Sequence, residues 1–331
     1  MRDAIIRIRV QEADALTMEA DVLALKYAQA LYGIDQAVAY RLVDAGLELN
    51  SMLPETNEHR LVPGHGSLGS RYALFVGIPD LLRVDYAELR LLASRTFEIL
   101  ADESVQVRHL VTTIHGPGFG LDEVEAFKAQ LAGMLDAIAK ERVPRDLTLV
   151  TIVEGNSGRA RRLTDILARE IPGGVLGRHG RHSPDASNSS HLQKTSGIEA
   201  DHKPRVFVAM SFDEAMDDVF HYGIQNAVHS AGFVCERADL AIFTGDILEW
   251  VKQRIASADL VIADLSEANP NVYLELGYAW GCQRSTVLVV RDEDHLQFDV
   301  RGQRCLIYKK IKDLETLLSA ELKGLAARPA S

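Results

Sequence analysis

The sequence predicts an α/β protein of two domains, and three observations carry that prediction. At 331 residues the chain is longer than a single hydrophobic core usually supports. Short apolar runs alternate with segments of helical periodicity on both sides of one polar stretch, which is typical of mostly parallel sheets covered by helices. That polar stretch, residues 173–203, is rich in Gly, Ser, His and Asn and lacks apolar periodicity.

These observations divide the chain into three parts. Residues 1–175 form a first α/β domain, residues 176–203 a flexible linker, and residues 204–331 a second α/β domain. In the first, strands are expected at 4–10, 21–25, 71–76, 109–113 and 147–153, and helices at 32–45, 86–100, 122–140 and 158–170. In the second, strands are expected at 205–209, 233–236, 260–263, 286–290 and 306–308, and helices at 213–231, 246–257 and 272–282.

The charge and the composition of the chain restrict the partners and the cellular location that are expected for it. The formal net charge of -11 disfavours non-specific binding to nucleic acid or to anionic membranes. No run approaches eighteen apolar residues, and the charged N-terminus is typical of a strand rather than a signal peptide, so a cytoplasmic protein is expected. Cys235, Cys282 and Cys305 are odd in number and widely spaced, which indicates reduced thiols and neither a disulfide framework nor a metal site.

Unusual residues follow two predicted strands of the second domain. Open α/β sheets bind ligands where strands end and helices begin. The first strand is followed by Met210, Ser211 and Phe212, and the third by Asp264. The sequence SEANPN then leads into a helix that contains Glu275.

Glu275 has two interpretations at this stage. A carboxylate near a helix N-terminus is favoured by the dipole, with Asn271 as N-cap, and this alone would explain it. Alternatively Glu275 shares the face of Asn271 and points back toward a ligand. Gly277, which costs about 1 kcal/mol in a helix interior relative to Ala, suggests a close approach by backbone or ligand.

The motifs of the second domain carry a family resemblance. RVFVAMSF, CERAD, ADLVIADLSEANPNVYLELGYAWG and FDVRGQRCLIY resemble the nucleoside 2-deoxyribosyltransferase-like superfamily, which shares a flavodoxin-like architecture with TIR domains. The resemblance implies that Glu275 is the nucleophile or ribose-contacting carboxylate and that Asp264 contacts the sugar or base. It also implies that Met210, Ser211, Phe212 and Asn271 shape the nucleotide pocket.

The TIR pattern is matched less well than the transferase pattern. TIR enzymes place a tryptophan and a cysteine before the glutamate, whereas Trp280 and Cys282 follow Glu275 here. Asp239 either lines the pocket or forms a salt bridge with Arg237, and Asp299 is a further candidate in a closing loop. Trp250 is expected in the core, and the tyrosines at 273 and 278 are expected to pack.

The first domain contains two glycine runs. GHGSLG at 64–69 matches GxGxxG in letters but precedes a strand, which excludes a dinucleotide fingerprint. The run at 116–120 follows a strand and precedes a helix, where backbone amides can hold phosphate, although Asp122 and Glu123 already supply negative charge there.

A second resemblance comes from the order of these motifs. ADVLALKYAQALYGIDQAVAYRLVDAG, PGHGSLGSRYALFVG and HLVTTIHGPGFGLDEVEAF resemble macro domains and the N-terminal domain of leucine aminopeptidases. This implies a mixed sheet with helices on both faces and a nucleotide ligand held by Gly33 and by Gly116, Gly118 and Gly120. The second domain is expected to be a flavodoxin-like (TIR-like), doubly wound parallel sheet.

Three functions are open from the sequence. The first is an NAD glycohydrolase effector of the bacterial anti-phage type, switched by a nucleotide second messenger in the first domain, with NAD as substrate and no cofactor. The second is a nucleoside or nucleotide 2-deoxyribosyltransferase or hydrolase. The third is a non-catalytic nucleotide-binding module. Self-association into a homo-oligomer through edge strands is also expected.

Overall fold

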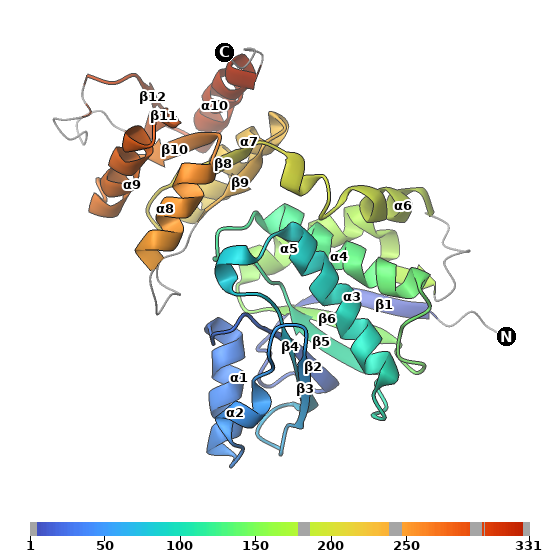
Figure 1. Ribbon diagram of the computed structural model, residues 1–331. Helices are drawn as coiled ribbons and strands as arrows, with labels where there is room; N and C mark the ends of the chain where they lie inside the picture. Colours follow the sequence, from blue (N-terminus) through green and yellow to red (C-terminus); the bar gives the residue numbers. More distant parts are fainter. Residues whose placement is uncertain (1–4, 178–185, 238–246, 292–299, 301, 327–331) are drawn as a thin grey trace. The chain divides into compact units, whose positions relative to one another are not determined.

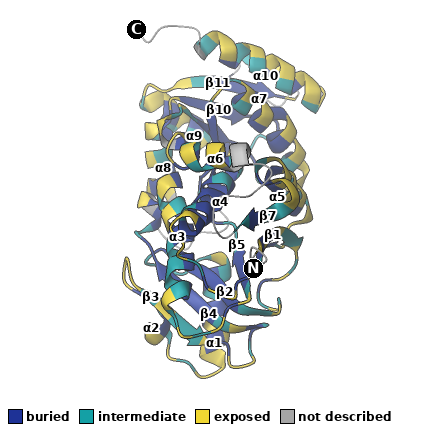
Figure 2. Cartoon of the chain, turned by 90° about the vertical axis from the view of Figure 1, so that its right-hand side faces the viewer, coloured by how far each residue is buried: buried dark blue, intermediate teal, exposed yellow. Residues whose placement is uncertain are grey.

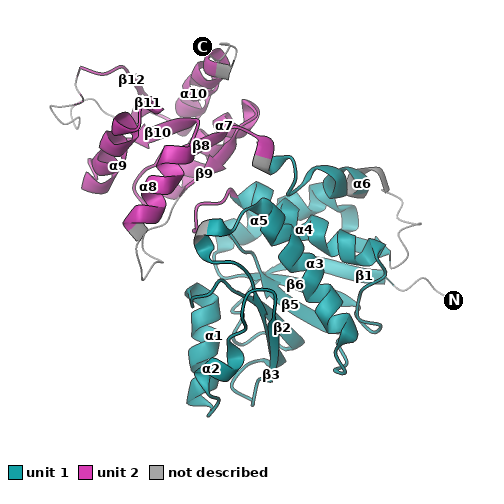
Figure 3. Ribbon diagram, viewed as in Figure 1, with its two compact units in different colours: residues 1–117, 123–201 teal, residues 118–122, 202–331 magenta. Residues whose placement is uncertain are grey.

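The computed structural model describes the whole chain except residues 1–4, 178–185, 238–246, 292–299, 301 and 327–331 (Figure 1). The chain divides into two compact units (Figure 3). Unit 1 comprises residues 1–117 and 123–201, and unit 2 comprises residues 118–122 and 202–331. Each unit is α/β, with one sheet and helices around it, so the predicted fold class is confirmed.

Unit 1 is built on a seven-stranded mixed sheet in the order β3-β4-β2-β5-β6-β1-β7. β3 is antiparallel to β4 and β7 is antiparallel to β1, and the remaining pairs are parallel. The strands are β1 (Ile5–Glu12), β2 (Ala20–Tyr27), β3 (His59–Pro63), β4 (Ser70–Gly77), β5 (His109–Thr113), β6 (Leu149–Glu154) and β7 (Val175–Gly177).

Helices cover both faces of this sheet. α1 and α2 pack on the face that carries Leu23 and Phe75, and α3 and α4 pack on the opposite face over Leu110. The helices of unit 1 are α1 (Gly33–Asp44), α2 (Leu49–Met52), α3 (Tyr86–Asp102), α4 (Glu123–Ala139), α5 (Ser157–Glu170) and α6 (Ala186–Thr195), with short 3-10 turns η1 (Leu81–Arg83), η2 (Pro172–Gly174) and η3 (Ala200–His202).

The described part of the segment expected as a linker, residues 176–203, contains secondary structure. β7 extends the sheet as far as Gly177, and α6 packs on α4. Gln193 donates a hydrogen bond to Asp136 at 2.8 Å, and Arg90 donates to the Ser196 carbonyl at 2.7 Å. The average composition of a polar segment does not show which of its residues form contacts of this kind.

Unit 2 is a five-stranded, fully parallel sheet in the order β12-β11-β10-β8-β9. Its strands are β8 (Arg205–Ala209), β9 (Val234–Glu236), β10 (Leu260–Asp264), β11 (Ser285–Val290) and β12 (Cys305–Ile307). Its helices are η4 (Glu214–Met216), the π-helix η5 (Val219–Gln225), α7 (Asn226–Ser230), α8 (Ile247–Ser257), α9 (Pro270–Gly281) and α10 (Ile311–Ala326).

Two apolar layers hold unit 2 together. η5, α7 and α10 pack on the face of Val206, Val208 and Ile262, whereas α8 and α9 pack on the face of Phe207 and Val261. The strands are mostly buried, and the helices expose residues on their outer faces (Figure 2). Strand order and two covered faces together make this a doubly wound sheet of flavodoxin-like order.

Two absences apply to the described residues. None of their helices has the length and apolar character needed to cross a membrane. They also contain no cluster of three or more His, Cys, Asp or Glu side chains suited to a metal ion.

Candidate functional site

The topology of unit 2 points to one edge of its sheet. β8 and β10 are neighbours, and the helical segments that follow them, η5–α7 and α9, cover opposite faces. At such a switch point the crossovers diverge and leave a crevice outside the carboxyl ends of the strands. The residues just after β8 and β10 are therefore the first candidates for ligand contact.

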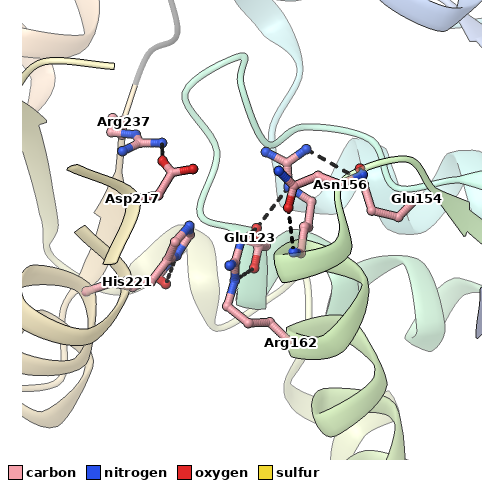
Figure 4. Close-up of polar contacts among 9 residues, drawn as sticks. Glu123, Glu154, Asn156, Arg162, Asp217, His221 and Arg237 are labelled. Atoms are coloured by element: carbon pink, nitrogen blue, oxygen red, sulfur yellow. Dashed lines mark hydrogen bonds and ion pairs between the residues drawn. The ribbon is translucent and has the colours of Figure 1, made fainter. Parts of the chain in front are cut away.

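The β8 end is built around Arg237, the residue that follows β9. Met210 and Ser211 are buried after β8, and Phe212 is half-buried. The Arg237 guanidinium lies 4.0 Å from the ring centroid of Phe220 and 5.1 Å from that of Phe212. It also forms an ion pair with Asp217 at 3.4 Å (Figure 4). Asp239, the partner considered for Arg237 from the sequence, lies outside the described residues, as does Asp299.

The β10 end is a closed polar network around Asp264, which is 3% exposed. Its Oδ1 accepts a hydrogen bond from the Ser266 backbone N–H at 2.9 Å, and its Oδ2 accepts one from the Tyr308 hydroxyl at 3.1 Å. Burial raises the pKa of Asp264, and burial together with the Asp264 charge raises the pKa of Tyr308 to about 12. Both Asp264 oxygens are thus engaged by the protein, which fixes this edge of the sheet.

Glu275 lies on α9, the helix that follows β10. Val272, Leu276 and Ala279 turn toward the sheet, which leaves Glu275 half-buried beside them. Among the described residues no side chain or backbone group forms a hydrogen bond or ion pair with its carboxylate. Burial raises the pKa of Glu275 to about 7. A desolvated carboxylate that no described residue neutralises is the arrangement expected of a functional group.

Two details of the predicted α9 need correction. The N-cap is Asn269, whose side chain accepts from the Asn271 N–H at 2.9 Å, and the helix begins at Pro270. Asn271 itself is exposed on the first turn, so it is not the cap that the sequence suggested. Pro at the first helical position favours this earlier start.

Gly277 is also placed differently from the expectation. Among the described residues, no atom lies within 4 Å of a Cβ built at Gly277, so none of their backbone approaches it. The other side-chain expectations agree better with the structure: Trp250 is 3% exposed in the core, and Tyr273 and Tyr278 pack against the same cluster. No disulfide joins Cys235, Cys282 and Cys305.

The four glycines proposed for the first domain separate into two pairs. Gly33 and Gly116 belong to unit 1, and both have positive φ, at 52° and 102°. Gly118 and Gly120, with φ of 85° and 87°, belong to unit 2. A Cβ at Gly120 would lie 2.3 Å from the Trp250 ring, so this glycine is explained by packing.

Unit 1 has a cavity that sequence reasoning missed. It measures about 580 Å³ and opens at the carboxyl ends of β1, β5 and β6. Ile34 and Pro117, which follow Gly33 and Gly116, line it together with Glu12, Asp14, Glu154 and Arg159. The sequence signal for this cavity was the acidic residues at the carboxyl ends of β1 and β6, Glu12 and Glu154.

Comparison with known proteins gives limited information. No protein-family model matches the chain, and no curated protein matches it. Among solved structures, it is similar to the CMP N-glycosidase BcmB of Clostridium botulinum, with 21% identity and a TM-score of 0.31 over 35% of this chain and 98% of that chain.

Two further similar structures are matched over most of the chain. They are to the bottromycin maturation enzyme BotP in complex with Mn, at 13% identity and a TM-score of 0.28 over 92% of this chain and 90% of that chain, and to BotP alone, at 14% identity and a TM-score of 0.29 over 92% and 89%. Identities and TM-scores of this size assign no family to the chain.

Proposed function

We propose that unit 2 cleaves the N-glycosidic bond of a nucleotide, with Glu275 as the carboxylate that meets the sugar. The observation that carries this proposal is the state of Glu275: it is half-buried, has no described protein partner, and has a pKa of about 7. A glutamate kept for helix stability alone would gain nothing from losing its solvent.

The chemistry follows from the charge of the transition state. Departure of the base leaves positive charge on the sugar ring, and an ionised carboxylate beside the anomeric carbon stabilises that charge or forms a bond to the carbon. Water then completes the hydrolysis. A carboxyl group with a pKa near 7 is ionised in about half of the molecules at neutral pH, and it is a strong base for its class.

NAD is the substrate that we favour. Its nicotinamide is already cationic in the intact nucleotide, so it leaves without being protonated. The other buried carboxyl at this edge, Asp264, is engaged by Ser266 and Tyr308, which favours a positioning role for it over that of an acid. We further propose that a small ligand in the unit 1 cavity controls turnover, as in an anti-phage effector, and that the protein self-associates.

The test is release of the base from the intact nucleotide by the purified full chain. NAD and the common 5′-nucleotides are incubated with wild type, Glu275→Gln and Glu315→Gln, and products are separated by chromatography. Glu315 is also half-buried, but it lies on α10, which packs on the opposite face of the sheet from α9, so its variant makes the same charge change outside the candidate site. We expect Glu275→Gln to lower kcat/KM by at least about 10²-fold and Glu315→Gln to leave it unchanged.

Two other outcomes separate the alternatives. Exchange of one base for an added free base, without net hydrolysis, would indicate a transferase in place of a hydrolase. Equal base release by wild type and Glu275→Gln, or binding of nucleotides with no release at all, would contradict the proposal and leave a binding module.

A further inference from the structure

The cavity of unit 1 has a distinctive set of charged groups. Three carboxylates line it, from Glu12, Asp14 and Glu154, against one cation, Arg159. Glu12 and Glu154 are register partners at the ends of the parallel strands β1 and β6, so two like charges stand side by side. Among the described residues, neither Glu12 nor Asp14 forms an ion pair.

Arg159 offsets the charge of Glu154 but not that of Glu12 or Asp14. Its Nε donates to Glu123 at 3.0 Å, and its Nη1 lies 3.5 Å from Glu154. Arg162, which is near it on α5, is likewise held by Glu123 at 2.8 Å (Figure 4). The guanidinium groups near the cavity are therefore committed to protein carboxylates, and the cavity retains negative charge.

The helix N-termini that could otherwise attract a phosphate group carry carboxylate side chains of the protein itself. At the start of α5, Asn156 caps the Arg159 N–H at 2.8 Å, and Glu154 accepts from the Asn156 N–H at 2.8 Å. Glu123 opens α4, and Asp35 lies in the first turn of α1, where it pairs with Lys26 at 2.5 Å. Helix N-termini bind anions through free N–H groups and the dipole, and these three are supplied with carboxylates from within the chain.

The remaining lining groups suit a ligand with hydroxyl donors and an apolar ring. Thr113 lines the cavity, and its buried Oγ1 has no hydrogen-bond partner among the described residues. Ile34, Ile114 and Pro117 supply apolar surface. A volume of about 580 Å³ lies within the range of small-molecule sites.

We infer that the unit 1 cavity binds a nucleoside-type ligand through carboxylates that accept from its hydroxyl and amino groups, and that it discriminates against the phosphorylated form. This deepens the control by a unit 1 ligand that is part of the proposed function, and it replaces the nucleotide second messenger expected from the glycine run. Phosphate would meet the charges of Glu12 and Asp14, which no described cation pairs, whereas a ribose diol would donate hydrogen bonds to them; Asp14 Oδ1 already accepts one from the Leu16 N–H at 2.9 Å.

The test measures binding directly and does not depend on turnover. The full chain with Glu275→Gln is titrated calorimetrically with the four common ribonucleosides, their 5′-monophosphates, ADP-ribose and spermidine. The same titrations are run after adding Glu12→Gln and Asp14→Asn, and after adding Asp44→Asn and Glu48→Gln, which remove the same charge from exposed positions around the C-terminal end of α1.

We expect at least one nucleoside to bind at least tenfold more tightly than its monophosphate. The cavity double variant should weaken that binding tenfold or more, and the distant double variant less than twofold. Tighter binding of a monophosphate or of ADP-ribose, binding of spermidine alone, or no nucleoside binding at 5 mM overturns the inference. Base release by the wild type in any of these cases would leave the unit 2 proposal standing.

Discussion

At the scale of single residues, Glu275 and Asp264 show how environment separates two carboxyl groups of one unit. Burial raises the pKa of both, but Asp264 accepts hydrogen bonds on each oxygen, whereas Glu275 has no described partner. A group that loses water without gaining a partner lowers stability, and such groups persist where function requires them. Under the proposed function, Asp264 therefore has a positioning role and Glu275 the chemical one.

A first prediction concerns stability and pH. Because the pKa of Glu275 is higher in the folded state, about 7 against an ordinary 4.5, the folded state binds more protons between these values. The free energy of unfolding therefore falls as the pH rises from 4.5 through 7, because the folded state must give up a proton that it holds more tightly than the unfolded state does. Glu275→Gln should stabilise unit 2 at pH 8 by up to about 3 kcal/mol and by almost nothing at pH 4. Urea unfolding at the two pH values checks this, and a pH-independent difference would contradict it.

A second prediction concerns Tyr308. Replacing it with Phe removes the donor to Asp264 but keeps the ring, so unit 2 should lose about 1 kcal/mol of stability. Because Tyr308 acts through Asp264, kcat should change by less than about tenfold while Glu275 remains. Thermal unfolding and base release on the same preparation measure both. A collapse of kcat without loss of stability would instead place Tyr308 in contact with substrate.

At the scale of elements, periodicity and strand-end residues predicted most of the fold. β5 and β8 have the predicted bounds, and most other elements lie within two or three residues of them. The single helix expected at 213–231 is instead η4, η5 and α7, because a π-helical stretch is invisible to a 3.6-residue pattern. β3 and α10 were missed: β3 is a short edge strand whose alternation is weak, and α10 follows the last recognised motif.

A third prediction uses two helical glycines as a matched pair. A Cβ at Gly277 meets nothing, whereas one at Gly223 meets the buried Leu314 side chain at 2.8 Å. Gly277→Ala should stabilise unit 2 by up to about 1 kcal/mol through helix propensity. Gly223→Ala should destabilise it by about 1 kcal/mol, because α10 must shift. Chemical unfolding gives both signs, and a stabilised but inactive Gly277→Ala would show that a ligand approaches that position.

At the scale of the whole molecule, residues 118–122 belong to unit 2 although unit 1 precedes and follows them in the sequence. Asp122 accepts from the Cys235 backbone N–H at 2.9 Å and from His229 at 2.6 Å, and Gly120 packs on Trp250. The sequence predicts one ligand loop for the whole glycine run at 116–120, because no local pattern shows that its two halves belong to different cores.

A fourth prediction tests this division with neighbouring residues. Asp122→Ala leaves the buried Cys235 N–H without its acceptor and should cost unit 2 about 1–3 kcal/mol. Glu123→Ala, one residue later, releases Arg159 and Arg162 and should affect α5 of unit 1. Hydrogen exchange read peptide by peptide should rise around β9 in the first variant and around α5 in the second. The same exchange pattern in both variants would contradict the division.

We propose that the ionised Glu275 carboxylate performs the reaction of unit 2. The pH dependence of kcat/KM for nicotinamide release from NAD, measured from pH 5 to pH 9 with wild type and Glu275→Gln, tests this proposal. We expect the wild-type rate to rise about tenfold per pH unit below 7 and to level off above it, and the variant to show a low, flat profile. A rate that falls as pH rises through 7, or equal profiles for the two proteins, would contradict it.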